Sequence, residues 1–189
     1  MSFPVFFDTC ALYGAALNDT LLRLAEHGIY RPIWSADVLA ELERNLAERV
    51  GSPAARRRVA AMASAFPDAS VEGYHYLIPT MTCDAKDGHV LAAAVRSGAA
   101  VLVTFNTADF PAESYEQFAL DVVHPDDFLL DQIDLHEQVV RASLAEQVDS
   151  ARNPPLTLTE LLAALSRAGV TRFATRVAQA EYRAEGDTP

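Results

Sequence analysis

Residues 84–110, DAKDGHVLAAAVRSGAAVLVTFNTADF, predict a helix that leads directly into a buried strand and a turn. In the helix, Val90, Leu91, Ala94 and Val95 recur at the spacing of one helical face. We expect Asp84 to be the N-cap of this helix and Gly98 to end it, since aspartate and glycine favour these positions. Residues 99–104 are continuously apolar up to the threonine, which is typical of strands in parallel sheets.

The same alternation of strand and helix extends toward the N-terminus. We expect strands at residues 5–7 and 31–34, helices at 11–27, 36–49 and 53–65, and a last strand at 121–123. Ser35 is placed to cap the helix that follows it. Alternating strands and helices predict an α/β fold with a mainly parallel central sheet.

The C-terminal part of the chain reads as helical. A long helix is expected at residues 125–150, with a break near Leu135, and a final one at 172–184. Thr157 and Glu160 have the spacing of a capping box before another helix. We therefore divide the chain into a domain of residues 1–125 and a helical extension of residues 126–189, which could pack on the same domain.

Composition limits the class of protein. Half of the 189 residues are hydrophobic, but none of the apolar runs is long enough to cross a membrane, and the N-terminus lacks the basic region of a signal peptide, so we expect a cytoplasmic protein without a membrane partner. Two cysteines, Cys10 and Cys83, do not make a disulfide scaffold. The net charge of −11 gives no overall attraction to nucleic acid, although residues 1–110 are closer to neutral than the rest.

Acidic and amide side chains occur at four points that a parallel sheet could bring to one edge. They are Asp8, Glu41, the pair Asp84 and Asp87, and the pair Asn106 and Asp109. Ligands in open parallel sheets gather beyond the carboxyl ends of the strands, where Asp8 and Asn106 should lie. Carboxylates gathered there repel one another unless a cation holds them, and Mg²⁺ or Mn²⁺ suits oxygen ligands. The pattern favours phosphodiester chemistry.

Each of these residues also has a purely structural explanation. Asp84 and Asp87 could serve only as helix caps, and Asn106 and Asp109 are common turn residues. Glu41 could be an ordinary surface acid, although Leu42 beside it is on the core side of the helix. We expect Asp87 to be the inner ligand and Asp84 to be partly a cap.

Two neighbouring side chains receive no role from the sequence. His89 is expected to point away from a metal at Asp87, and the position of Lys86 between two acids is read as coincidental.

Residues 3–111 resemble the PIN-domain ribonucleases, and among them the VapC-type toxins of bacterial toxin–antitoxin pairs. The matching motifs are VFFD ending at Asp8, SADVLAEL around Glu41, DAKDGHVLAAA from Asp84 to Ala94, and LVTFNTADFP from Leu102 to Pro111. The resemblance implies a three-layer α/β/α sandwich with a C-terminal helical extension. It also implies a metal site with Asp8, Glu41 and Asp87 as ligands, with Asp84 as a further candidate.

The resemblance assigns supporting residues as well. Asn106 stands where many members have a fourth acid, Asp109 is a second candidate for that place, and Thr104 is the threonine or serine near the site. The implied activity is that of a metal-dependent endoribonuclease using Mg²⁺, with Mn²⁺ as a substitute. The catalytic set is then Asp8, Glu41, Asp87, Asn106 and Asp109.

The expected partners are an RNA substrate, a cognate antitoxin and a second copy of the chain. Arginines 44, 49 and 56–58 are candidates to hold the RNA backbone, or they could form a solvated helix face. The alternative function is a non-catalytic PIN-type module that binds RNA or protein. A phosphatase with an aspartyl nucleophile is disfavoured because Cys10 stands where that motif has a second aspartate.

Overall fold

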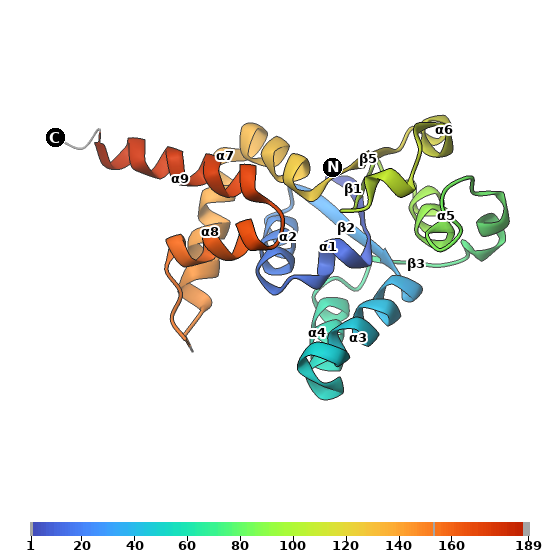
Figure 1. The fold of residues 1–189 in the computed structure, drawn as a ribbon, viewed down its shortest axis with the longest axis horizontal. Helices are drawn as coiled ribbons and strands as arrows, with labels where there is room; N and C mark the ends of the chain where they lie inside the picture. Colours follow the sequence, from blue (N-terminus) through green and yellow to red (C-terminus); the bar gives the residue numbers. More distant parts are fainter. Residues whose placement is uncertain (1, 153, 187–189) are drawn as a thin grey trace. The chain divides into compact units, whose positions relative to one another are not determined.

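A five-stranded parallel sheet forms the centre of the fold in the computed structural model, which describes residues 2–152 and 154–186 (Figure 1). The strands are β1 (Phe3–Phe7), β2 (Tyr30–Ser35), β3 (Ser70–Val71), β4 (Val101–Val103) and β5 (Asp121–Val123). Their order is β3-β2-β1-β4-β5, and each neighbouring pair is parallel. The expected α/β class with a parallel sheet is confirmed.

Helices connect these strands and continue to the C-terminal part. They are α1 (Thr9–Tyr13), α2 (Ala15–Glu26), α3 (Ala36–Val50), α4 (Ser52–Ala65), α5 (Gly88–Ser97), α6 (Ala112–Tyr115), α7 (Pro125–Ser150), α8 (Leu158–Arg167) and α9 (Thr171–Gly186). Short 3₁₀ turns lie at η1 (His75–Thr80), η2 (Thr107–Asp109) and η3 (Glu116–Phe118). Within the described ranges, no helix has both the length and the apolar character needed to cross a membrane.

The chain forms two compact units. The first contains the sheet and consists of the chain up to Tyr13 together with Gly28–His124. The second consists of Gly14–His27 together with the chain from Pro125 onward, so α2 joins the C-terminal helices. The boundary between independent domains at residue 125 stays a prediction.

Strand β1 lies at the point where the order of the sheet reverses. The chain adds β2 and then β3 on one side of β1, and β4 and then β5 on the other. Val5, Phe6 and Phe7 are completely buried, which fixes the strand in the core. Phe7 pairs with Val103, so β1 and β4 end side by side and deliver the residues that follow them to one place. Such a reversal is the usual ligand position in open α/β sheets.

Helix α3 begins as the sequence predicts. Ser35 accepts a hydrogen bond from the Val38 amide at 3.2 Å and caps the helix. The buried residues Val38, Leu42 and Leu46 step along one side by four, which turns the opposite side of the helix away from the core.

The start of α5 differs from the prediction. Asp84 does not cap the helix: its Oδ1 accepts a hydrogen bond from the Lys86 amide at 3.0 Å and closes a turn. Because the chain turns once more before it becomes helical, α5 starts at Gly88, with Asp87 in the N-cap position and without a side-chain cap bond. Aspartate favours such local turns as strongly as it favours caps.

The structure also corrects the helix expected after β1 and confirms two features of the C-terminal helices. The helix expected over residues 11–27 is two helices, because Gly14 has an extended backbone with ψ of 123° and interrupts it. The break expected near Leu135 is confirmed, since His136 has non-helical backbone angles within α7. The capping box of Thr157 and Glu160 at the start of α8 is confirmed as well.

Replacing the cap of α3 should weaken the fold. We expect Ser35→Ala to lower the free energy of unfolding by about 1 kcal/mol, because a buried helix amide loses its acceptor. Urea denaturation followed by circular dichroism measures the change. Ser52→Ala is the matched control, because Ser52 is exposed at the start of α4 and follows the cap residue Gly51. Equal losses in the two variants would contradict the assigned cap.

Candidate active site

A cavity of about 400 Å³ in the first unit collects most of the residues that the sequence singles out. Asp8, Glu41, Asp87 and Asn106 line it, and they come from the end of β1, from α3, from the start of α5 and from the turn after β4. The remaining lining residues are Thr9, Cys10, Tyr13, Asn45 and Glu48. Residues separated by almost a hundred positions in the chain therefore face one space.

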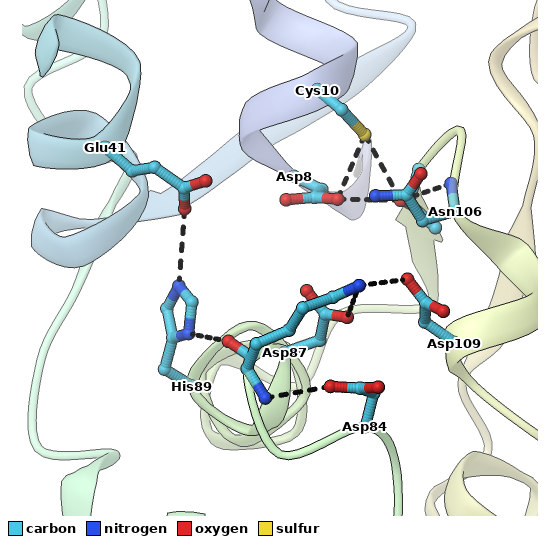
Figure 2. Close-up of polar contacts among 10 residues, drawn as sticks. Asp8, Cys10, Glu41, Asp84, Asp87, His89, Asn106 and Asp109 are labelled. Carbon is cyan, nitrogen blue, oxygen red and sulfur yellow. Dashed lines mark hydrogen bonds and ion pairs between the residues drawn. The ribbon is translucent and has the colours of Figure 1, made fainter. Parts of the chain in front are cut away.

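Asp8 is buried at the centre of this arrangement (Figure 2). Its amide donates to the Val103 carbonyl at 3.1 Å, which ties the end of β1 to the end of β4. Its Oδ2 accepts hydrogen bonds from the Thr104 hydroxyl at 2.7 Å and from the Cys10 thiol at 3.0 Å. Two donors thus hold one carboxylate oxygen and fix the direction of the group.

Glu41 forms the opposite wall of the cavity. The Thr9 hydroxyl donates to its Oε2 at 3.1 Å, and His89 Nε2 lies 3.8 Å from the same oxygen. His89 Nδ1 is 3.0 Å from the Lys86 carbonyl, which orients the ring toward Glu41 (Figure 2). His89 therefore lies beside Glu41 but does not line the cavity, and the expectation that it points away from a metal at Asp87 stays a prediction.

Asp87 is the least compensated carboxylate of the site. Its Oδ2 is buried and has no hydrogen-bond partner within the described residues. Burial, partly offset by Lys86 and reinforced by the charges of Asp8, Asp109 and Asp84, raises the pKa of Asp87 to about 6. A buried carboxylate with an unpartnered oxygen and an acidic neighbourhood is a position where a cation would lower the energy.

Lys86 supplies the positive charge that the structure itself contributes. Its ammonium lies 3.0 Å from Asp109 Oδ2 and 3.8 Å from Asp87 Oδ2, and the first of these contacts is a hydrogen bond (Figure 2). The position of Lys86 is therefore not coincidental. Asp109 is engaged with Lys86, and Asp84 with its own turn, so neither of them lines the cavity.

Cys10 is a further residue that the sequence did not assign. Its sulfur accepts the Phe105 amide at 3.2 Å and lies 3.3 Å from the Thr104 hydroxyl. Burial and the charge of Asp8 raise the pKa of the thiol to about 12, so the group stays neutral and can donate to Asp8. Only its position two residues after Asp8 could have suggested this role from the sequence.

The donor set fits a hard divalent cation held partly by water. Asp8, Glu41 and Asp87 offer carboxylate oxygens, Asn106 adds an amide, and Mg²⁺ commonly binds through one or two carboxylates while keeping waters. Across residues 2–152 and 154–186, no three His, Cys, Asp or Glu side chains form a ready-made metal cage. The observation in favour of a metal is that the buried Asp87 Oδ2 has no hydrogen bond within the described residues and only a 3.8 Å ion pair with Lys86.

Comparison with known proteins agrees with this architecture. The family model for the PIN domain matches residues 4–108, more than half of the sequence. The chain belongs to the PIN-domain family, and the three-layer α/β/α fold expected from the resemblance follows from that membership. A second family model, the VapC50 C-terminal domain, matches residues 125–179.

One curated relative adds a more specific likeness. The chain is 45% identical over 104 residues to the protein named "Putative ribonuclease VapC50" of Mycobacterium tuberculosis (strain ATCC 25618 / H37Rv). That match covers 55% of this chain and 61% of the relative, which is less than two thirds of its length. The resemblance to VapC proteins is thereby confirmed. No solved structure matches the chain.

Removing the charge of Asp87 should stabilise the metal-free protein at neutral pH. A carboxyl whose pKa rises on folding binds more protons in the folded state, so its ionisation lowers stability as the pH rises from about 4 to about 6. In EDTA at pH 7, we expect Asp87→Asn to have a free energy of unfolding about 1–2 kcal/mol higher than that of the wild type. This is less than the full pKa shift implies, because solvent reaches the cavity. The difference should disappear near pH 4, where the wild-type carboxyl is protonated.

Thermal or urea unfolding at the two pH values measures the effect. Mg²⁺ should then stabilise the wild type more than the variant, because the variant lacks one ligand charge. If Asp87→Asn is less stable than the wild type at pH 7, the conclusion that the ionised Asp87 carboxylate destabilises the folded protein is contradicted.

Proposed function

We propose that this protein is a metal-dependent endoribonuclease that hydrolyses RNA phosphodiester bonds. The observation that carries the proposal is the meeting of Asp8, Glu41, Asp87 and Asn106 in one cavity where the order of a parallel sheet reverses. Membership of the PIN-domain family and the likeness to a protein named as a ribonuclease support the same reading.

In this mechanism, Asp8, Glu41 and Asp87 would hold Mg²⁺, for which Mn²⁺ would substitute. The bound ion would lower the pKa of a water molecule and stabilise the negative charge that builds up on the phosphate. Thr104 and Cys10 keep the Asp8 carboxylate in place, and Thr9 does so for Glu41. Groups that orient ligands commonly change metal affinity or activity by about 10–100-fold when they are removed.

Asn106, Asp109 and Asp84 take more peripheral parts in the proposal. Asn106 faces the cavity as a neutral ligand or as a donor to the substrate. Asp109 holds Lys86 beside Asp87, and Asp84 fixes the turn that carries both residues.

The biological role that we propose is the toxin of a type II toxin–antitoxin pair in the cytoplasm. The likeness to a VapC protein supports it. The antitoxin would place a basic side chain, such as an arginine, against the carboxylates of the cavity, since a guanidinium pairs well with carboxylate oxygens. We also propose that the toxin acts as a homodimer.

A non-catalytic binding module is the second candidate. It is favoured by the finding that the described residues contain no ready-made three-residue metal cage. Isothermal titration with Mn²⁺ separates the two readings: binding that disappears in Asp8→Asn and Asp87→Asn supports the nuclease, and failure of the wild type to bind Mn²⁺ supports the module.

Substitution of Asp8 should abolish cleavage. We expect wild-type protein free of antitoxin to cut RNA with Mg²⁺ or Mn²⁺ and not with EDTA. The Asp8→Asn variant should cut at least about 100-fold more slowly, because losing a metal ligand should cost no less than losing a residue that orients a ligand. A panel of structured and single-stranded RNAs, resolved on denaturing gels, measures the rates.

Asp121→Asn is the matched control, because Asp121 is an exposed aspartate at the amino end of β5. It should retain the wild-type rate. Equal metal-dependent cutting by wild type and Asp8→Asn would overturn the assignment of the site.

A further inference from the structure

The cavity has a second wall that the proposed metal site does not use. Tyr13 of α1 and Asn45 and Glu48 of α3 line the same space as the carboxylates. Glu41, Asn45 and Glu48 are four and three positions apart, so they follow one face of α3. The rise of a helix separates Glu41 from Glu48 by about 10 Å, which places this wall beside the metal site and not within it.

The polar groups of this wall are not engaged by the protein. Within the described residues, no side chain or backbone group hydrogen-bonds with the Tyr13 hydroxyl, the Asn45 amide or the Glu48 carboxylate. Glu48 also lies in the last turn of α3, at the negative end of the helix dipole, where a carboxylate is unfavourable. Glu48 is exposed to solvent and Tyr13 and Asn45 are half-buried, so the polar groups of this wall are accessible to a ligand.

Two arginines hold Tyr13 in position. The Arg58 guanidinium donates to the carbonyls of Leu12 at 2.7 Å and Tyr13 at 3.1 Å, at the end of α1. The Arg49 guanidinium carbon lies 5.9 Å from the centre of the Tyr13 ring. An aromatic ring that is fixed in this way can stack a nucleobase without first being ordered.

Several arginines lie on the two helices that carry Arg49 and Arg58. Helices α3 and α4 contain five of the nine basic residues in the first 110 positions: Arg44, Arg49, Arg56, Arg57 and Arg58. Helix α4 carries three of them and no acid, whereas α3 carries two arginines and four acids, so a phosphate backbone would be attracted mainly to α4.

We propose that this wall is a subsite for a guanine base of single-stranded RNA, next to the phosphodiester that is cut. The identity of the ligand as RNA rests on the proposed function. The guanine stacks on Tyr13 and donates its N1–H and N2–H groups to the two oxygens of the Glu48 carboxylate. Asn45, with one acceptor and one donor, lies one helical turn closer to the metal site, where it contacts the sugar or the base edge.

Glu48 selects guanine because of what each base presents on its Watson–Crick edge. A carboxylate offers only acceptors, and guanine alone carries two adjacent N–H donors there. Adenine and cytosine each place a ring-nitrogen acceptor beside their single amino group, and uracil has one N–H between two carbonyl oxygens. Each of these three bases would bring an acceptor against Glu48.

Binding of short RNAs to a cleavage-inactive protein tests the subsite. Asp8→Asn protein with Mg²⁺ is titrated into fluorescein-labelled oligoadenosines that carry one central guanosine, inosine, adenosine, cytidine or uridine, and anisotropy gives the affinities. We expect guanosine to bind about tenfold more tightly than adenosine, since a good bidentate contact discriminates by about this factor. Inosine, which lacks the N2 amino group, should lie between them.

Variants in the same background separate recognition from charge. Adding Glu48→Gln should reduce the preference for guanosine over adenosine to less than about twofold. Glu43→Gln removes the same charge from α3 but lies outside the cavity lining, and it should keep the full preference. Tyr13→Phe should retain binding, and Tyr13→Leu should weaken all the RNAs.

Equal affinities for the five RNAs, or a preference that survives Glu48→Gln, would overturn the subsite. The cleavage assay is scored independently. Cutting by the wild type without a guanosine near the cut would overturn the subsite and leave the nuclease in place. Guanosine-selective binding without any cutting would support the subsite and count against the nuclease.

Discussion

The buried carboxylate of Asp8, anchored between the ends of two parallel strands, is the contact on which the site depends. Its amide bonds to the Val103 carbonyl and its Oδ2 accepts from Thr104, so one residue joins β1 to β4 through both backbone and side chain. The completely buried Val5–Phe7 stretch keeps β1 at the centre of the sheet. Because the order of strands reverses here, the carboxylate stands at the sheet position where a ligand is usually bound.

The cost of gathering acids at this point explains the side chains around them. A neutral thiol and a hydroxyl, not further charges, stabilise Asp8, and a single ammonium from Lys86 lies between Asp109 and Asp87. These contacts leave one buried Asp87 oxygen without a hydrogen-bond partner in the described residues, and the pKa of that group stays raised. The carboxylates of Asp8 and Asp109 are therefore stabilised by hydrogen bonds or an ion pair within the protein, whereas the carboxylate of Asp87 would be stabilised further by a bound cation.

The sequence predicted most strands and helices and singled out four of the cavity-lining residues, Asp8, Glu41, Asp87 and Asn106. Those features depend on local pattern: apolar runs followed by Asp8 and Thr104, and a capped amphipathic helix carrying Glu41. The other lining residues were not predicted. The sequence misplaced features that depend on a choice between local structures. Asp84 could close a turn or cap a helix with similar energy, and Gly14 could continue a helix or interrupt it. The contacts of Lys86 with Asp109, of His89 with Glu41 and of Cys10 with Phe105 join residues that are far apart in the sequence. Residue spacing along the chain does not reveal such contacts.

The chemistry of Asn106 bears on how much charge the cavity can hold. With an amide in place of a fourth acid, the lining toward the sheet carries the three carboxylates of Asp8, Glu41 and Asp87. In the proposed mechanism, one divalent ion would leave these three carboxylates with a single negative charge, and the carboxylate of Glu48 lines the same cavity. A further acid at position 106 would increase the repulsion of the substrate phosphate unless a second ion were bound. Under the proposed function, the neutral side chain of Asn106 would therefore keep the repulsion between the cavity and a phosphate low enough for one ion to offset it.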